Sequence, residues 1–130
     1  MIVMNIYTDG SCIKNPGGPG GWAFCIPDKF VVSGYDNSTT NNKMELKAVI
    51  EALKFANTLD ITIHTDSKYV IKCAKGEFKI NANKDLWDEY FKISKNIKIT
   101  WIWVKGHSNN YYNDIVDKYA YAESTKKFEK

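Results

Sequence analysis

Four acidic residues lie far apart in the chain, and each stands in a local pattern that could aim its carboxylate at one shared point. They are Asp9 in TDGSC, Glu45 in TTNNKMEL, Asp66 in HTDSKYV and Asp117 in WVKGHSNNYYNDIVDKYA. Grouped carboxylates repel one another strongly unless cations lie between them, and oxygen ligands of this kind suit Mg²⁺. The set is therefore what a magnesium-dependent enzyme acting on phosphodiesters would require.

The elements that must position these residues follow from the spacing of the apolar side chains. Short β-branched and apolar runs bounded by turn residues predict five strands, over residues 2–8, 22–26, 30–35, 61–65 and 97–104. Helical spacing predicts a helix of about four turns from residue 42 and further helices over residues 67–73, 85–94 and 110–125.

The order of these elements predicts an α/β fold with a five-stranded mixed sheet flanked by helices, in a single domain over residues 1–130. Strands separated by helices usually return parallel, so the first, fourth and fifth strands should be parallel neighbours, with the second and third antiparallel to one side. Asp9 and Asp66 each end a strand in the same I-x-T-D pattern. Both carboxylates should emerge at the carboxyl edge of the sheet, where Glu45 and Asp117 can join them from flanking helices.

Each acid alone also has an ordinary explanation. Asp9 with Gly10 fits a turn, Asp66 with Ser67 a helix N-cap, the stretch from Asn42 to Glu45 a capped helix start, and Asp117 a solvated helix face. The functional interpretation therefore rests on the occurrence of all four acidic residues together. It is supported by the last helix, where one face carries a polar pair beside small apolar residues: Asn113, Asp117, Val116 and Ala120.

The histidines and the paired tryptophans have different expected roles. His107 directly follows a strand and a glycine, which puts it on a loop over the same edge, as a surface residue or a proton carrier; its neighbours favour the carrier. His64 lies within a strand and is expected to be packed or hydrogen-bonded. Trp101 and Trp103 share one face of the fifth strand and are expected in the core.

Composition limits the classes of protein that fit. With 44% apolar and 25% charged residues, the chain resembles ordinary globular domains, and its first ten residues reach a charge too soon for a signal peptide, so a cytoplasmic protein without a membrane segment is expected. Three cysteines without a CxxC pair indicate reduced thiols. All 18 basic residues are lysines and the net charge is +3, which permits nucleic acid without requiring it. The stretch from Gly17 to Gly21 lacks nucleotide-loop spacing, and no protease or esterase motif is present.

Six motifs occur in order from about Asn5 to Ala122: TDGSC, NPGG, TTNNKMEL, TDSKYV, DLW and WVKGH, the last followed at suitable intervals by Asn and Asp. In this the chain closely resembles type I ribonuclease H. The resemblance implies a ribonuclease H-like fold and an endonuclease that cuts the RNA strand of an RNA/DNA hybrid, leaving 5′-phosphate and 3′-hydroxyl ends. It also implies two Mg²⁺ ions, with Mn²⁺ as a substitute, held by the four carboxylates.

The resemblance implies roles for further residues. His107 matches a loop histidine that assists proton movement or product departure, and Asn113 an asparagine that supports the metal site. RNA is told from DNA by its 2′-hydroxyl. The residues that the resemblance assigns to the RNA strand and its minor groove are Glu45, Asn15, Asn41 and Asn42, with backbone groups near Cys12, Lys14 and Lys68. A pocket for a DNA-strand phosphate would use Thr40 and Asn83.

Two departures from the family pattern predict weaker hybrid binding. Ser38 occupies a position where some members carry an arginine for the DNA phosphate. Between Tyr69 and Leu86 the chain has a short connection where well-known bacterial members carry an extra helix and a basic loop. Phe78 could contact a deoxyribose, and four lysines could form a diffuse basic patch: Lys72, Lys75, Lys79 and Lys84.

Two other functions remain open from the sequence. One is a nucleic-acid-binding domain that has kept the fold and lost turnover, although no acid is missing. The other is a related metal nuclease for DNA junctions or single-stranded DNA. The asparagines assigned to the 2′-hydroxyl contacts argue against this second function. No heptad pattern suggests assembly, so a monomer is expected.

Overall fold

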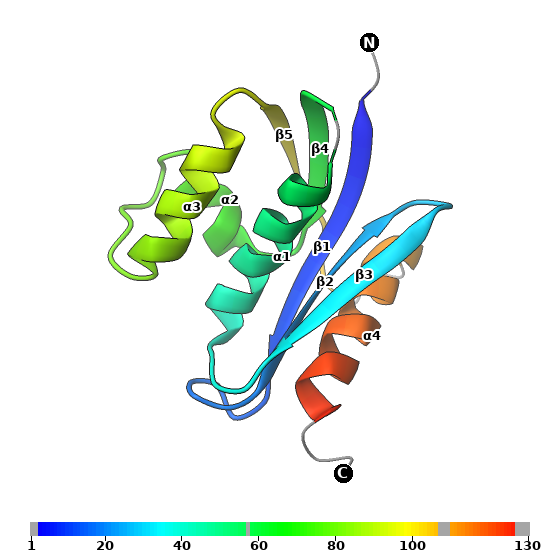
Figure 1. The fold of residues 1–130 in the computed structure, drawn as a ribbon, viewed down its shortest axis with the longest axis vertical. Helices are drawn as coiled ribbons and strands as arrows, with labels where there is room; N and C mark the ends of the chain where they lie inside the picture. The colour runs from blue at the N-terminus through cyan, green and yellow to red at the C-terminus, as the bar shows by residue number, and fades with distance from the viewer. Residues whose placement is uncertain (1–2, 57, 107–109, 127–130) are drawn as a thin grey trace.

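The alternating pattern of strands and helices folds into one five-stranded sheet in the computed structural model, which describes residues 3–56, 58–106 and 110–126 (Figure 1). The order across the sheet is β3-β2-β1-β4-β5. The strands are β1 (Met4–Cys12), β2 (Gly20–Ile26), β3 (Phe30–Asp36), β4 (Asp60–Thr65) and β5 (Lys98–Trp103). Strands β1, β4 and β5 are parallel, while β2 is antiparallel to both β1 and β3, as the sequence predicted.

The register between β1 and β4 is the one that the repeated I-x-T-D pattern indicated. Ile6 pairs with Ile63 and Tyr7 with His64, so Asp9 and Asp66 occupy equivalent positions along the two strands. The predicted end of β1 at Thr8 is wrong, because β2 continues to pair with β1 beyond the last β4 partner. Asp9 therefore lies inside β1, opposite Ala23 of β2.

Four helices connect and cover the strands: α1 (Asn41–Phe55), α2 (Lys68–Ala74), α3 (Lys84–Ser94) and α4 (Tyr111–Thr125). Side-chain caps define three of the helix starts. Thr40 accepts a hydrogen bond from the backbone N–H of Lys43 at 3.1 Å, Ser67 one from Val70 at 3.1 Å, and Asn110 one from Asn113 at 3.0 Å. All four predicted helices are present within a residue or two of their expected bounds.

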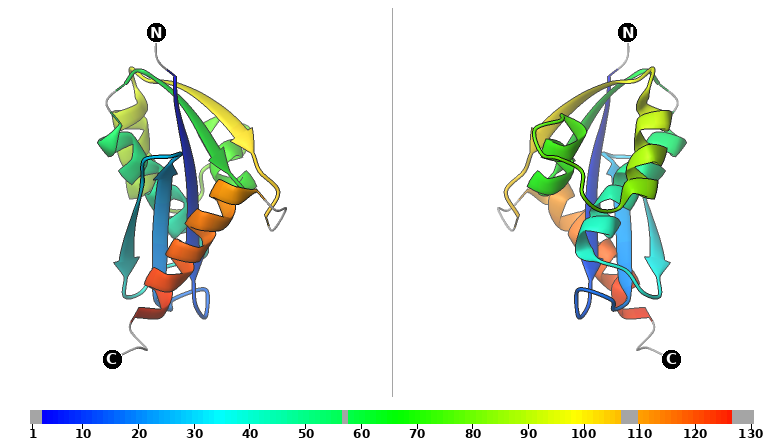
Figure 2. Two further views of the ribbon diagram at one scale, coloured as in Figure 1. Left: turned by 90° about the vertical axis from the view of Figure 1, so that its right-hand side faces the viewer. Right: turned by 90° about the vertical axis from the view of Figure 1, so that its left-hand side faces the viewer.

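Helices α1 and α3 lie on one side of the sheet and α4 on the other (Figure 2). The larger core lies between the sheet and the first pair, where Leu46, Val49 and Trp87 pack with Ile6 and Phe24. A smaller core lies under α4: Ala23, Cys25, Val116 and Ala120. None of the helices in the described ranges is long and apolar enough to cross a membrane, and Cys12, Cys25 and Cys73 are all free.

The environments of the strand histidine and the two tryptophans differ. His64 is hydrogen-bonded as expected, with its Nε2 3.0 Å from Asn5 Oδ1, and its ring stacks on Tyr7 at 4.1 Å. Trp101 packs against the core beside Tyr90. The expectation that Trp103 also lies in the core is wrong: its side chain is 46% exposed, because it ends the edge strand β5, beyond the reach of α3.

Candidate metal centre

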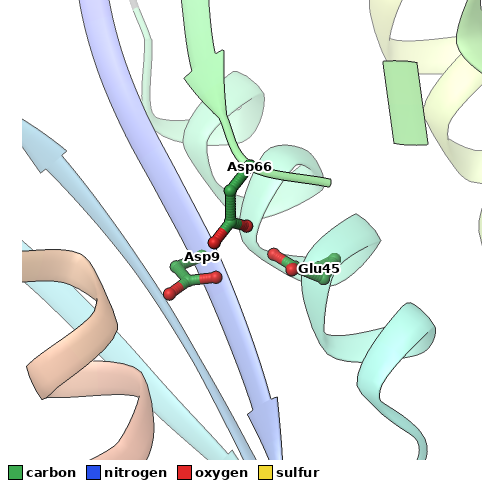
Figure 3. A group of neighbouring side chains, drawn as sticks. All are labelled: Asp9, Glu45 and Asp66. Atoms are coloured by element: carbon green, nitrogen blue, oxygen red, sulfur yellow. The ribbon is translucent and has the colours of Figure 1, made fainter. Parts of the chain in front are cut away.

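Three of the four acidic residues converge at the carboxyl edge of the parallel strands. Asp9 extends from β1, Glu45 from the second turn of α1, and Asp66 from the residue after β4 (Figure 3). One carboxylate oxygen from each lies within 4.8 Å of the others. The shared register of β1 and β4 brings the two aspartates together, and α1 packs against β1 to add the glutamate.

The ordinary explanations account for these three acids only in part. Asp9 lies within a strand rather than a turn, and Thr40 rather than Asn42 caps α1. The Asp66–Ser67 pair does begin a helix, but Ser67 is the residue that caps α2, so capping does not engage the Asp66 carboxylate. Asp9 and Glu45 are also buried, at 3% and 6% exposure. Carboxylates are seldom buried without a partner, so this arrangement calls for a functional explanation.

The close approach of α1 to β1 depends on Gly10. A Cβ atom at this position would lie 2.3 Å from the backbone nitrogen of Glu45 and 2.4 Å from the carbonyl carbon of Met44. Both atoms belong to the helix backbone and cannot move aside as a flexible side chain could. Gly10 therefore sets the distance between Asp9 and the helix that carries Glu45.

We expect Gly10→Ala to disturb the site and the fold together. Overpacking of this kind typically costs about 1–3 kcal/mol in the free energy of unfolding, and the shift of α1 would move Glu45 away from Asp9. Urea unfolding and a nuclease assay on the same preparation would measure both effects. Ser11→Ala is the neighbouring control, and a Gly10→Ala protein with wild-type stability and activity would contradict this account of the packing.

The electrostatics of the cluster are those of negative charge without a compensating cation. Burial, followed by the charge of Asp66, raises the pKa of Asp9 to about 8. Burial and the charges of Asp9 and Asp66 raise the pKa of Glu45 well above its ordinary value. Glu45 Oε1 is buried and has no hydrogen-bond partner among the residues that the structure describes. Three oxygen ligands with an unsatisfied buried atom fit a divalent cation of the Mg²⁺ type.

Asp117 lies at the margin of this group rather than inside it. It is half-buried on α4 and is absent from the set of oxygens within 4.8 Å, yet its charge contributes to the raised pKa of Asp9. One turn earlier, Asn113 is almost fully buried, and its Oδ1 has no partner in the described part of the chain. The helix face predicted from the sequence thus presents a carboxylate and an amide near Asp9.

Most of the residues assigned to the RNA strand lie where the loop after β1 meets the start of α1, whereas Lys68 is the first residue of α2. Asn15 Oδ1 accepts a hydrogen bond from the backbone N–H of Asn41 at 3.0 Å, which ties the loop to the helix. Cys12 Sγ lies 3.5 Å from the carbonyl oxygen of Thr39. Lys14 has a left-handed backbone conformation and is exposed, as is Asn42 on α1. These side chains therefore flank one side of the three carboxylates.

The two residues assigned to the DNA strand are Thr40, which caps the start of α1, and Asn83, which directly precedes α3. Asn83 has a left-handed conformation before α3 and donates its amide N–H to the hydroxyl of Tyr69 at 3.0 Å. It lines a pocket with Lys43, which is one turn into the helix capped by Thr40. The sequence did not single out Lys43, because only the folded chain brings α1 and α3 together.

The loop before α4 is described in part. His107 lies outside the described residues. Gly106, which precedes it, lies beside Asp66, since a Cβ atom there would be 3.1 Å from Asp66 Oδ2. Neither Gly10 nor Gly106 was identified as a site residue from the sequence, although each directly adjoins a residue that was: Asp9 and His107.

A mixed sheet of this order, with carboxylates converging at the edge of its central parallel strands, defines a ribonuclease H-like metal-dependent nuclease. The chain belongs to the ribonuclease H family: the family model described as RNase H matches residues 2–125. It is 44% identical to the ribonuclease H of Thermoanaerobacter sp. (strain X514), over 91% of this chain and 87% of the relative. It is 45% identical to the ribonuclease H of Ehrlichia ruminantium (strain Gardel), over 93% of this chain and 94% of the relative.

Solved structures agree on the fold. The crystal structure of LC11-RNase H1 in complex with an RNA/DNA hybrid superposes with a TM-score of 0.83 at 22% identity, covering 97% of this chain and 99% of that one. At this identity the likeness concerns the fold alone. Together with the family match and the curated relatives, it identifies the chain as a type I ribonuclease H, a metal-dependent endoribonuclease.

Proposed function

We propose that this ribonuclease H hydrolyses the RNA strand of RNA/DNA hybrids by two-metal-ion catalysis, with Mg²⁺ as the natural ion and Mn²⁺ as a substitute. Asp9, Glu45, Asp66 and Asp117 would hold the ions, and the products would carry 5′-phosphate and 3′-hydroxyl ends. The observation that carries this proposal is the convergence of three carboxylates, two of them buried, around the unpartnered Glu45 Oε1.

Bound magnesium would supply a water of lowered pKa and neutralise charge on the phosphodiester. The chain itself supplies the arrangement of ligands. Asp9 and Asp66 are fixed by two paired strands, and Glu45 by a capped helix packed on Gly10. Asp117 and the buried amide of Asn113 come from α4, so this helix supplies the side chains on one side of the site.

For the choice of strand, we assign the RNA 2′-hydroxyl contacts to Glu45, Asn15 and Asn41. Backbone groups near Cys12, Lys14 and Lys68 add further contacts, and Asn42 contacts a base or sugar across the minor groove. The hydrogen bond from the backbone N–H of Asn41 to Asn15 Oδ1 supports this assignment, because it fixes the Asn15 side chain against the start of α1 before substrate arrives. Minor-groove contacts of this kind distinguish RNA from DNA.

For the DNA strand, we assign a phosphate contact to Thr40 and Asn83, with Lys43 close by. Ser38 donates its hydroxyl to the carbonyl oxygen of Gly17 at 2.9 Å and offers no charge to a phosphate. Residues 75–83, all of them described, form neither helix nor strand. Both features support weaker hybrid binding than in members with a basic loop. The monomeric state and the cytoplasmic location stay predictions.

The proposal is tested by cleavage of labelled hybrid, RNA duplex, DNA duplex and single-stranded DNA, each with Mg²⁺ or Mn²⁺, followed by identification of the product ends. We expect cleavage of the RNA in the hybrid alone. Binding without cleavage under all conditions would favour the nucleic-acid-binding alternative. Cleavage of the DNA substrates would favour the DNA nuclease.

We expect His107→Ala to slow hybrid cleavage by about 10²-fold without abolishing it. A residue that relays protons contributes roughly 10²–10⁴ to a rate, and the low end applies where water can replace the side chain. Single-turnover rates at saturating Mg²⁺ would measure the effect. Complete inactivity would show that His107 has a more central role than proton relay.

A further inference from the structure

Trp103 connects the end of β5 to the metal centre. Its indole Nε1 donates a hydrogen bond to the backbone carbonyl oxygen of Asp66 at 3.2 Å. Almost half of its side chain remains exposed. A large aromatic residue that is both exposed and bonded to the segment carrying a metal ligand is in a position to contact substrate as well as to brace the site.

Lys68 lies over the same ring. It is the first residue of α2, two positions after Asp66, and its Nζ is 4.7 Å from the centroid of the Trp103 ring. A lysine over an indole is held there by a cation–π interaction. Within the described ranges, no carboxylate forms an ion pair with Lys68, whereas Lys72 on the same helix pairs with Glu77 at 3.8 Å. Lys68 therefore keeps its charge available for a phosphate.

The ring and the lysine form one concave surface. Together with Ile71 and Lys72 they line a pocket of about 270 Å³ between α2 and the end of β5. The floor is apolar, from the indole and Ile71, and the rim is positively charged. This combination suits a sugar–phosphate backbone, in which an apolar sugar face alternates with an anionic phosphate.

The pocket lies on the β5 side of the carboxylates, opposite the residues assigned to the 2′-hydroxyl contacts at the start of α1. In the sheet, β5 and β2 are on opposite sides of the β1–β4 pair that carries Asp9 and leads to Asp66. The Asn15–Asn41 contact is on the β2 side, at the loop between β1 and β2. A strand that passes the metal centre from that side next meets Lys68 and Trp103.

We propose that Trp103 and Lys68 form a contact for the sugar–phosphate backbone of the substrate strand where it leaves the metal centre on the β5 side. This inference rests on the proposed function. Trp103 offers its ring face to a sugar and holds Lys68 toward the adjoining phosphate, so it acts as both a contact and a positioning residue. In this chain the contact extends the interface in a region where the connection between α2 and α3 is short.

The test compares Trp103→Ala, Trp103→Phe and Lys68→Ala with two matched controls. Tyr121→Ala removes an exposed aromatic ring from α4, and Lys98→Ala removes a lysine from the other end of β5. Affinity for uncut hybrid is measured in an Asp9→Asn background over a series of salt concentrations. Steady-state cleavage is measured in the otherwise wild-type protein.

We expect Trp103→Ala to weaken hybrid binding and raise KM by roughly 5- to 150-fold, the range for one lost stacking contact, with a smaller change in kcat. Trp103→Phe keeps a ring and should retain most of the affinity. Lys68→Ala should lower the slope of log K against log salt by about one. The effects of Trp103→Ala and Lys68→Ala should be less than additive, because the ring positions the lysine.

The inference is overturned if Lys68→Ala and Trp103→Phe/Lys68→Ala bind hybrid with the wild-type affinity and salt slope. It is also overturned if Trp103→Ala lowers kcat at unchanged KM, since that result indicates a brace for Asp66 alone. Should Trp103→Ala fail to fold, the Lys68→Ala result decides, because this exposed side chain can be removed without loss of core packing. Failure of the wild-type protein to cleave hybrid would instead reject the proposed function.

Discussion

Replacing Asp66 by asparagine is expected to lower the rate of hybrid cleavage by at least about 10²-fold and to leave the fold intact. Loss of a residue that merely supports a metal ligand typically costs about 10–100-fold in metal affinity or activity, so loss of a ligand should cost more. Asparagine keeps the shape of the side chain, but its neutral amide removes a negative charge from a site that depends on charge to attract a divalent cation. Asp9→Asn should have the same effect on cleavage.

The experiment is a single-turnover assay at saturating hybrid over a range of Mg²⁺ concentrations. The matched control is Asp88→Asn, which makes the same exchange of one carboxylate oxygen for an NH2 group at an exposed aspartate on α3. Circular dichroism on each preparation verifies the fold. If Asp66→Asn or Asp9→Asn cleaved hybrid at the wild-type rate, the assignment of the metal centre would be refuted.

Much of the sheet followed from patterns that are local in the sequence. The repeated I-x-T-D pattern placed Asp9 and Asp66 at equivalent positions because parallel strands align their side chains residue by residue. The helical spacing of apolar residues indicated which segments form the helices that connect the parallel strands. The length of β1 could not be obtained in this way, because a strand continues as long as it has a partner, and the partner beyond Thr8 is β2.

The sequence predicted which residues form the candidate site better than it predicted how deeply their side chains are buried. Acidic residue types and motif order indicated Asp9, Glu45 and Asp66, but their burial depends on how closely α1 packs on Gly10. Trp103 was predicted to be buried and is instead exposed. An apolar residue that alternates correctly within a strand is predicted to lie in the core, yet at the end of the edge strand β5 only α2, among the described elements, lies beside Trp103, and almost half of the side chain stays exposed. Such exposure is a property of the sheet order, which is not local.

Without metal, the stability of the protein is expected to fall as the pH rises from about 4 to about 8. In the folded state the pKa of Asp9 is raised from 3.8 to about 8, and the pKa of Glu45 is raised as well. The unfolded chain releases these protons near pH 4, while the folded protein retains them. Each proton that only the folded state retains lowers the free energy of unfolding by about 1.4 kcal/mol per pH unit.

A comparison of variants shows whether this pH dependence of stability comes from the metal centre or from other titrating groups. Thermal unfolding in the presence of a chelator, at pH 5 and pH 8, should show that Asp9→Asn raises the melting temperature more at pH 8 than at pH 5, whereas Asp88→Asn does not. Mg²⁺ at pH 8 should raise the melting temperature of the wild-type protein and do so less for Asp9→Asn, because a ligand that binds only the folded state stabilises it. An equal effect of Asp9→Asn at both pH values would contradict the raised pKa of Asp9. The burial and mutual repulsion of these carboxylates weaken the metal-free fold, and a bound cation offsets both, so catalytic loss and stability gain from one substitution would have a single physical cause.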